Sequence, residues 1–116
     1  MENRNMKEIS YRDFSNIEMR VGRIIKAQDF PKALKPAYKL WIDFGDLGVK
    51  KTSAQITELY DRNDLLNKKI IAVVNFPPKQ VADFMSEVLV LGVVLEDGAV
   101  SLLSTDHDLP PGARVM

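Results

Sequence analysis

The fold of this chain is decided by the stretch Tyr38-Lys39-Leu40-Trp41-Ile42-Asp43-Phe44. Its residues at positions 38, 40, 42 and 44 are apolar and alternate with Lys39, Trp41 and Asp43. This period of two predicts a β-strand with one face in the core. Gly45-Asp46-Leu47-Gly48 supplies a turn, and residues 49–56 are expected to return as a second strand of a hairpin.

The residues before this hairpin predict a long bent strand and a short helix. Residues 19–30 (MRVGRIIKAQDF) have the composition of a strand, and Gly22 in its middle predicts a bulge or a sharp bend. Long strands that bend are what a small barrel needs to close. Upstream, Ser10 and Asp13 have the spacing of a helix N-terminus, which predicts a short turn of helix over residues 11–16.

The residues after the hairpin predict further strands. A short helix or helical turn is expected within residues 57–68, packed against one end of the barrel. The β-branched apolar run of residues 69–76 predicts a strand that Pro77 and Pro78 end. Residues 86–95 predict another strand with Gly92 at its centre, and residues 99–104 predict the second strand of a last hairpin.

This order of elements predicts an all-β-dominated fold, a five-stranded OB-fold barrel with short helical segments and extra C-terminal strands. A helix between the third and fourth strands is the OB-fold arrangement, whose face and loops bind oligonucleotides and other extended ligands. Other small barrels could produce a similar order. Because no repeat, linker or low-complexity segment interrupts the chain, residues 1–116 are expected to form one domain.

Composition argues for a binding protein rather than an enzyme. The chain has no cysteine and a single histidine, His107, which lies in a polar stretch and has no second histidine to complete a metal site. No motif of an activated nucleophile or a phosphate-binding loop occurs. We therefore expect no catalytic residues, no metal and no cofactor. The longest apolar run, residues 88–95, is too short to span a membrane, so no membrane insertion and a cytoplasmic location are expected.

The formal net charge is zero, but the charges are distributed unevenly. Residues 1–53 carry a net +4, residues 54–79 carry +1, and residues 80–116 carry −5. A polyanionic partner is therefore expected to contact the first two-thirds of the chain. The alternative is ordinary scatter of surface charge.

Lysines gather around the first hairpin and adjoin its outward tryptophan. They are Lys26, Lys32, Lys35, Lys39, Lys50 and Lys51. A lysine beside an outward Trp41 pairs a phosphate contact with a stacking platform, as sites for single-stranded nucleic acids do. Alternatively, Trp41 packs under a neighbouring loop or at a dimer contact while the lysines are solvated.

The stretch Asn75-Phe76-Pro77-Pro78-Lys79 predicts a rigid binding loop. Two prolines after a strand hold the backbone extended with few internal hydrogen bonds. Asn75 offers a donor and an acceptor, and Phe76 offers a ring for stacking or for the wall of an apolar pocket. Alternatively, Phe76 is only the last core residue of its strand.

Several long strings resemble the tRNA-binding domain family, the OB-fold module that occurs as free-standing dimers or appended to methionyl- and bacterial phenylalanyl-tRNA synthetases. The opening string is FSNIEMRVGRI (residues 14–24), followed by FPKA (residues 30–33). Within that family the chain is most similar to the CsaA branch, through YKLWIDFG (38–45), TSAQIT (52–57), VNFPPK (74–79) and SEVLVLG (86–92). The resemblance covers nearly the whole chain.

This resemblance implies a non-enzymatic homodimeric chaperone that binds unfolded or export-bound polypeptides of the secretion pathway, and also tRNA. The residues expected to form its RNA- and peptide-binding site are Lys39, Trp41, Lys51, Ser53, Asn75, Phe76, Lys79 and Ser86. Among them, Phe76 and Trp41 are expected to give apolar or stacking contacts and Asn75 and Ser86 hydrogen bonds. Lys39, Lys51 and Lys79 are expected to contact phosphates.

The chain departs from dedicated tRNA-binding members at the binding loop. Those members tend to read N-L-K-P-R-K-M and then S-x-G-M, so two of their cations are replaced here by Pro77 and Gln80, and Gly-Met becomes Val88-Leu89. Fewer cations predict weaker RNA binding, and the added apolar side chains suit an extended peptide. The competing hypothesis is a dedicated module for tRNA or structured RNA with incidental peptide affinity; a structural dimer without a ligand is the third.

Overall fold

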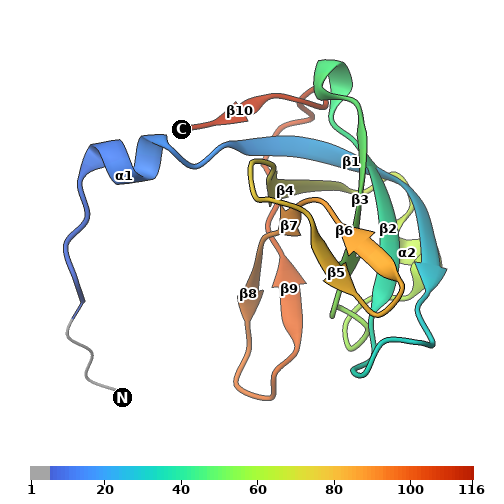
Figure 1. Cartoon of the computed structure of the whole chain (residues 1–116). Helices are drawn as coiled ribbons and strands as arrows, with labels where there is room; N and C mark the ends of the chain where they lie inside the picture. Colours follow the sequence, from blue (N-terminus) through green and yellow to red (C-terminus); the bar gives the residue numbers. More distant parts are fainter. Residues whose placement is uncertain (1–5) are drawn as a thin grey trace.

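The computed structural model describes residues 6–116, so the first five residues of the expected domain lie outside it (Figure 1). The hairpin predicted from the alternating stretch is present. Strand β2 (Tyr38–Asp43) alternates buried and half-buried residues, the 3-10 turn η1 (Gly45–Leu47) follows, and β3 (Val49–Ala54) pairs antiparallel with β2. The predicted inward residues of β2, together with Phe44, are all in the core.

Strand β1 (Met19–Asp29) is the long strand around which the barrel is built. Its first half pairs with β4 (Lys69–Val73), and its second half pairs with β2. The register with β2 shifts between Ile24 and Lys26, which places a bulge in the middle of the strand. A bulge bends a strand and increases its twist, so one strand can serve two walls of the barrel.

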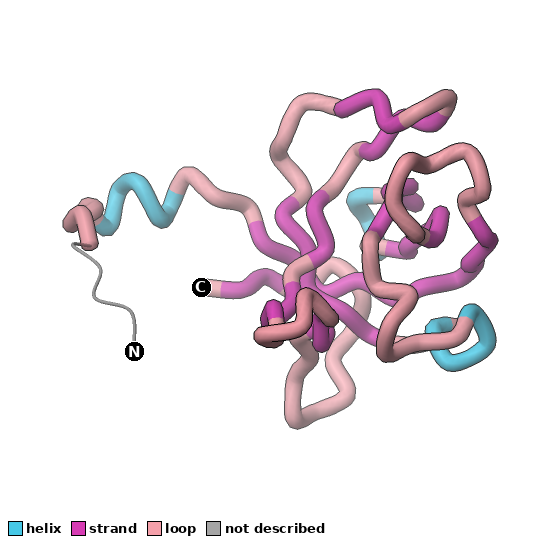
Figure 2. Tube along the Cα trace, turned by 90° about the horizontal axis from the view of Figure 1, so that it is seen from below, coloured by secondary structure: helices cyan, strands magenta, loops and turns pink. Residues whose placement is uncertain are grey.

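The remaining elements are short. They are α1 (Tyr11–Ser15), α2 (Arg62–Leu65), β5 (Lys79–Val81), β6 (Phe84–Ser86), β7 (Leu89–Val90), β8 (Gly92–Val94), β9 (Val100–Leu102) and β10 (Arg114–Val115). The main sheet has the order β3-β2-β1-β4-β7, with β10 also pairing with β1, while β5-β6 and β8-β9 are separate two-stranded sheets. Figure 2 shows the strands curling around one centre, with α1 standing apart from them.

The two ends of the main sheet meet and nearly close the barrel. The Glu87 N–H donates to the Lys51 carbonyl over 2.8 Å, and the Lys51 N–H donates to the Glu87 carboxylate over 2.9 Å. The buried Thr52 hydroxyl donates to the Val88 carbonyl over 2.7 Å. The expected OB-type barrel with short helical segments is therefore confirmed.

The core fills the barrel from strands that are distant in the sequence. Its fully buried members include Ile24, Leu40, Ile42, Phe44 and Ile70. The predicted helical turn is present as α2, shorter than residues 57–68, and its Leu65 is fully buried in the same core. The predicted turn of helix at the N-terminus is α1, where Ser10 and Asp13 form a capping box.

The prediction of a bulge at Gly22 is wrong, because the bulge of this strand lies after Ile24. Gly22 pairs regularly with Ile70. A Cβ atom at Gly22 would lie 2.5 Å from Ile42 Cγ2 and 2.6 Å from Phe44 Cε1. The position therefore lacks a side chain because two core side chains of the hairpin pack directly on its backbone.

The single strand expected over residues 86–95 is also wrong. The segment contributes to three different sheets, through β6, β7 and β8, with Glu87 and Val88 between the first two closing the barrel against β3. An apolar run identifies extended backbone but not its pairing partner. The final hairpin is confirmed, since β8 pairs with β9 across the expected turn.

Two pairings were not expected from the sequence. β5 and β6 form a small hairpin that packs on the outer face of β2 and β3, and β10 pairs with the start of β1 (Figure 1). Strands β5 and β6 have three residues each, too few to display a period. Within residues 6–116, no helix is long and apolar enough to cross a membrane.

Candidate binding groove

An open groove of about 550 Å³ lies between the end of β3, the loop after β4 and the segment that joins β6 to β7. Its lining consists of Thr52, Ser53, Ala54, Gln55, Ile56, Phe76, Pro77, Lys79, Val81, Ser86, Glu87, Val88, Leu89, Val90 and Val100. Ile56 and Val88 are buried, whereas Phe76 is 53% exposed and Leu89 49% exposed. The groove therefore presents accessible apolar side chains above a packed apolar floor, which is typical of ligand sites.

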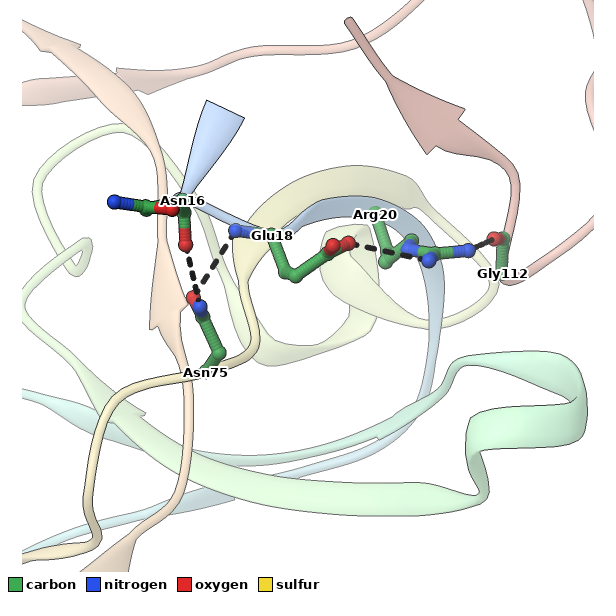
Figure 3. Close-up of polar contacts among 5 residues, drawn as sticks. All are labelled: Asn16, Glu18, Arg20, Asn75 and Gly112. Carbon is green, nitrogen blue, oxygen red and sulfur yellow. Dashed lines mark hydrogen bonds and ion pairs between the residues drawn. The ribbon is translucent and has the colours of Figure 1, made fainter. Parts of the chain in front are cut away.

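The loop that carries Phe76 is anchored at its base by Asn75 (Figure 3). The Asn75 Oδ1 accepts from the Glu18 N–H over 3.0 Å, and its Nδ2 donates to the Asn16 carbonyl over 2.7 Å. The Val74 N–H adds a bond to the Glu18 carbonyl over 2.8 Å. Both ends of the amide are thus used within the chain, and they tie the loop to the segment between α1 and β1.

A second polar network supports the segment that Asn75 joins. The Arg20 guanidinium forms an ion pair with Glu18 at 3.1 Å and donates to the Gly112 carbonyl over 3.1 Å (Figure 3). These contacts connect the start of β1 to the tail that leads into β10. The base of the loop is therefore bonded to a segment that is itself held by contacts between β1 and the C-terminal tail.

Ser53 and Ser86 connect β3 to the hairpin β5–β6 at the edge of the groove. The Ser53 N–H donates to Ser86 Oγ over 3.0 Å, and the two hydroxyls lie 2.9 Å apart. Both serines are half-buried and line the groove. A hydroxyl keeps acceptor capacity after one bond, so the pair can still contact a ligand's backbone N–H.

Trp41 lies beneath the hairpin β5–β6, in a second apolar cluster. Its ring meets Phe84 edge-on at a centroid distance of 5.7 Å, and Phe84 meets Phe30 at 5.7 Å in the same manner. This environment agrees with the alternative stated above, in which Trp41 packs under a neighbouring segment of the chain. Half-buried and covered by Phe84, the indole has its ring engaged within the protein.

Three lysines cover this aromatic cluster. The ammonium of Lys26 lies 4.6 Å from the centre of the Trp41 ring, that of Lys39 lies 4.8 Å from the Phe30 ring, and that of Lys51 lies 5.1 Å from the Phe84 ring. Such cation–π contacts position an ammonium without neutralising its charge. The cluster is thus apolar inside and positively charged outside.

Residues 19–114 match the family model described as "Putative tRNA binding domain". This chain belongs to the tRNA-binding domain family. Among curated proteins, this tRNA-binding domain is 34% identical over 110 residues to a methionine–tRNA ligase of Methanocaldococcus jannaschii, covering 95% of this chain and 17% of that protein. A methionine–tRNA ligase of Pyrococcus horikoshii is 35% identical over 117 residues, which cover 98% of this chain and 15% of the ligase. The chain therefore spans less than a fifth of these ligases.

Solved structures of chaperones have the same fold as this tRNA-binding domain. The CsaA chaperone protein from Picrophilus torridus superposes with a TM-score of 0.88 at 57% identity, covering 94% of this chain and 100% of that one. The chaperone CsaA from Bacillus anthracis gives a TM-score of 0.91 at 48% identity, covering 95% and 100%. The expected resemblance to the tRNA-binding domain family and its CsaA branch is confirmed.

The structure divides the predicted site residues into two sets. Ser53, Phe76, Lys79 and Ser86 line the groove. Lys39, Trp41 and Lys51 lie instead in and over the aromatic cluster, while Asn75 anchors the loop from behind. Their contacts with RNA or peptide stay predictions.

Other lining residues were missed by sequence reasoning. Ile56 and Glu87 line the groove, and Phe84 builds the wall between the two sets. Phe84 lies two residues after Ala82, whose φ of 52° helps to make the turn, so no periodic pattern marks Phe84 in the sequence. Among the described residues, no group of three or more histidines, cysteines or carboxylates could hold a metal ion.

Asp83, in the turn between β5 and β6, forms a surface ion pair with Lys32. Lys32 Nζ lies 2.8 Å from the Asp83 carboxylate, and this hydrogen bond lowers the pKa of Asp83 and raises the pKa of Lys32. Both groups are exposed, so the pair contributes little stability. The ammonium of Lys32 does offset the negative charge of Asp83, which lies near Lys39.

Substituting Asn75 tests whether its amide serves the fold or a ligand. Asn75→Ala should lower the free energy of unfolding by about 1–2 kcal/mol, because it removes two hydrogen bonds of about 1 kcal/mol each. Asn75→Asp keeps the acceptor and loses the donor. Its free energy of unfolding should therefore lie between those of Asn75→Ala and the wild type. Urea unfolding measures both variants. Unchanged stability of Asn75→Ala would show that the amide is not holding the loop and would favour a direct ligand contact.

Proposed function

We propose that this protein is a non-enzymatic, chaperone-type binding protein that holds extended segments of unfolded or export-bound polypeptides in the groove and also binds tRNA. The observation that carries the proposal is the half-exposed apolar rim of Phe76 and Leu89 over a buried floor. We assign this activity to a homodimer in the cytoplasm.

The groove suits an extended polypeptide with apolar side chains. Its volume of about 550 Å³ admits a few such side chains, and burying one contributes about 1.5–3 kcal/mol. Gln55 is exposed at the rim and can donate and accept hydrogen bonds with a peptide backbone. Pro77 and the anchored Asn75 hold the loop in place, so little ordering of this wall would accompany binding.

The tRNA half of the proposal rests on the family and on charge. The methionine–tRNA ligases share this domain across most of its length. Exposed Lys79 at the groove and the lysines over the aromatic cluster supply cations for a phosphate backbone. The binding loop has two cations fewer than that of dedicated members, which predicts weaker tRNA binding with a smaller salt dependence.

The homodimer would cover apolar residues that this chain leaves exposed. Helix α1 has no buried residue, and Ile9 and Tyr11 beside and within it are 67% and 78% exposed. The segment that carries them leads away from the barrel (Figure 1). Apolar side chains gathered on a projecting segment are typical of a surface that packs on another chain, and a second copy is the occupant that we propose.

Phe76→Ala is the test of the polypeptide site. A labelled, uncharged peptide rich in leucine and serine should bind this variant about tenfold more weakly, because about half of the Phe76 ring is available for burial. Binding of bulk tRNA should change less than twofold. The matched control is Leu34→Ala, which removes a fully exposed apolar side chain from the loop between β1 and β2. Equal peptide affinity of the two variants would contradict the groove as the peptide site.

A dedicated tRNA-binding module with incidental peptide affinity is the second candidate, favoured by the match to the family model over residues 19–114. It predicts that the peptide binds weakly and without dependence on Phe76, while tRNA binding persists. The same two titrations therefore distinguish the candidates.

A further inference from the structure

The loop that carries Phe76 is hydrogen-bonded to residues 16–18, the segment that joins α1 to β1. We call this segment the stem of α1. Asn75 accepts from the Glu18 N–H over 3.0 Å and donates to the Asn16 carbonyl over 2.7 Å (Figure 3). The Asn75 amide therefore holds the stem at two points, one residue before a phenylalanine that lines the groove.

These bonds lie beyond the last regular pair of the β1–β4 ladder. That pair is Met19 with Val73, and the Val74 N–H adds one bond to the Glu18 carbonyl over 2.8 Å. Hydrogen bonds at the end of a ladder open locally, at a much smaller cost than global unfolding. How firmly the loop is held therefore depends on how firmly the stem is held.

The stem is weakly held within a single copy of the chain. Helix α1 has five residues and none of them is buried, and Ile17 in the stem is 41% exposed. So short a helix is marginal in water unless one of its faces packs on another surface. In the proposed homodimer, a second copy supplies this surface to Ile9 and Tyr11, and packing there would fix the stem.

We propose that dimerisation at α1 strengthens polypeptide binding in the groove, and that Asn75 is the positioning residue that transmits the effect. The stem has two states, which differ in whether the bonds of Asn75 are made. A second copy on α1 favours the bonded state, and so does a polypeptide that contacts Phe76. This inference rests on the proposed function, in which the protein dimerises and binds a polypeptide.

The first test compares the peptide affinity of dimer and monomer. The double variant Ile9→Glu, Tyr11→Glu serves as the monomer, and Leu34→Glu is the control for added charge. The monomer should bind a labelled, uncharged peptide rich in leucine and serine about fivefold more weakly than the wild-type dimer, because a loss of this size corresponds to one hydrogen bond. Leu34→Glu should bind this peptide with wild-type affinity.

The second test asks whether Asn75 transmits the effect. Asn75→Ala alone should also weaken peptide binding about fivefold or more, since it removes both bonds to the stem. Adding Ile9→Glu and Tyr11→Glu to Asn75→Ala should then change the peptide affinity less than twofold. An equal further loss in the two backgrounds would overturn the role of Asn75.

The third test uses the reciprocity of linkage. If dimerisation strengthens peptide binding at each groove, a saturating peptide must strengthen the dimer. Because the dimer has two grooves, a fivefold effect at each should lower the dissociation constant of the dimer about 25-fold. Asn75→Ala should dimerise without this response to peptide, which a purely structural role of the amide would not predict.

Hydrogen exchange separates the proposed coupling from damage to the fold. The amide N–H groups of Glu18 and Val74, which make the bonds between stem and loop, should exchange faster in the monomer than in the wild-type dimer. The amide of Leu40, in the core strand β2, should exchange at the same rate in both.

The outcomes distinguish this inference from the proposed function. If the folded monomer binds the peptide with wild-type affinity, the inference fails while the proposed function stands. If the wild type does not dimerise, or does not bind the peptide at all, that part of the proposed function fails and the inference fails with it.

Discussion

Replacing Phe84 with alanine should lower the free energy of unfolding by about 3 kcal/mol, since a buried phenylalanine truncated to alanine leaves a cavity as well as losing its burial. The ring is 7% exposed and joins Phe30 and Trp41 at 5.7 Å on either side. It also lies under the ammonium groups of Lys39 and Lys51. The loss should appear in urea unfolding as a lower midpoint with an unchanged slope.

The same substitution should weaken both binding activities. Without Phe84 the hairpin β5–β6 loses its one buried aromatic contact with the barrel and is held by Val81, by the pair of Ser53 with Ser86 and by the pair of Lys32 with Asp83. Both the groove wall formed by the hairpin and the aromatic cluster beneath the lysines would then be less well ordered. Met85→Ala is the control, because Met85 alternates with Phe84 on β6 and is 39% exposed. It should cost less than about 1 kcal/mol, and an equal cost for the two variants would show that Phe84 does not hold the hairpin.

The double variant Ile9→Glu, Tyr11→Glu should convert the proposed homodimer to a monomer. Each apolar side chain buried at an interface contributes about 1.5–3 kcal/mol, and a two-fold interface contains every substituted position twice. Association should therefore weaken at least 100-fold. Light scattering with size exclusion should report the chain mass of 13.1 kDa for the variant and twice this mass for the wild type.

Leu34→Glu controls for the effect of the added charge. Leu34 is fully exposed and lies in the loop between β1 and β2, which is away from α1 (Figure 1). This variant should remain a dimer. A wild-type protein that elutes as a monomer at all concentrations would remove the dimer from the proposed function, and dissociation of Leu34→Glu would place the interface elsewhere.

The strands of the barrel could be predicted where one face is buried over several residues. β2 shows a period of two because Leu40 and Ile42 enter the core while Lys39 and Trp41 do not. β1 could be predicted as a strand, but not the place of its bulge, since that place depends on how the strand divides its pairing between β2 and β4. The three-residue strands β5 and β6 could not be predicted, because docking on β2 and β3 positions them and their own pattern does not.

The candidate site could be predicted in composition but not in arrangement. Phe76, Lys79, Ser53 and Ser86 were expected at one site and do line one groove. Asn75 was expected to face a ligand, yet its amide is bonded to Asn16 and Glu18, residues far away in the chain. No local pattern reports which backbone groups will come within reach of a side chain after folding.

The sequence by itself determined that this chain forms a small β-barrel of the tRNA-binding domain family, with lysines around its first hairpin and a rigid apolar loop after its fourth strand. Alternation along a strand and prolines that end one are local properties, so the sequence displays them directly. Only the tertiary structure decided that Trp41 is covered, that Phe84 covers it, and that Lys39 pairs with Ser53 at the edge of the groove. Those relations depend on contacts between β2, β3 and β6, and such contacts exist only once the barrel has brought distant segments together.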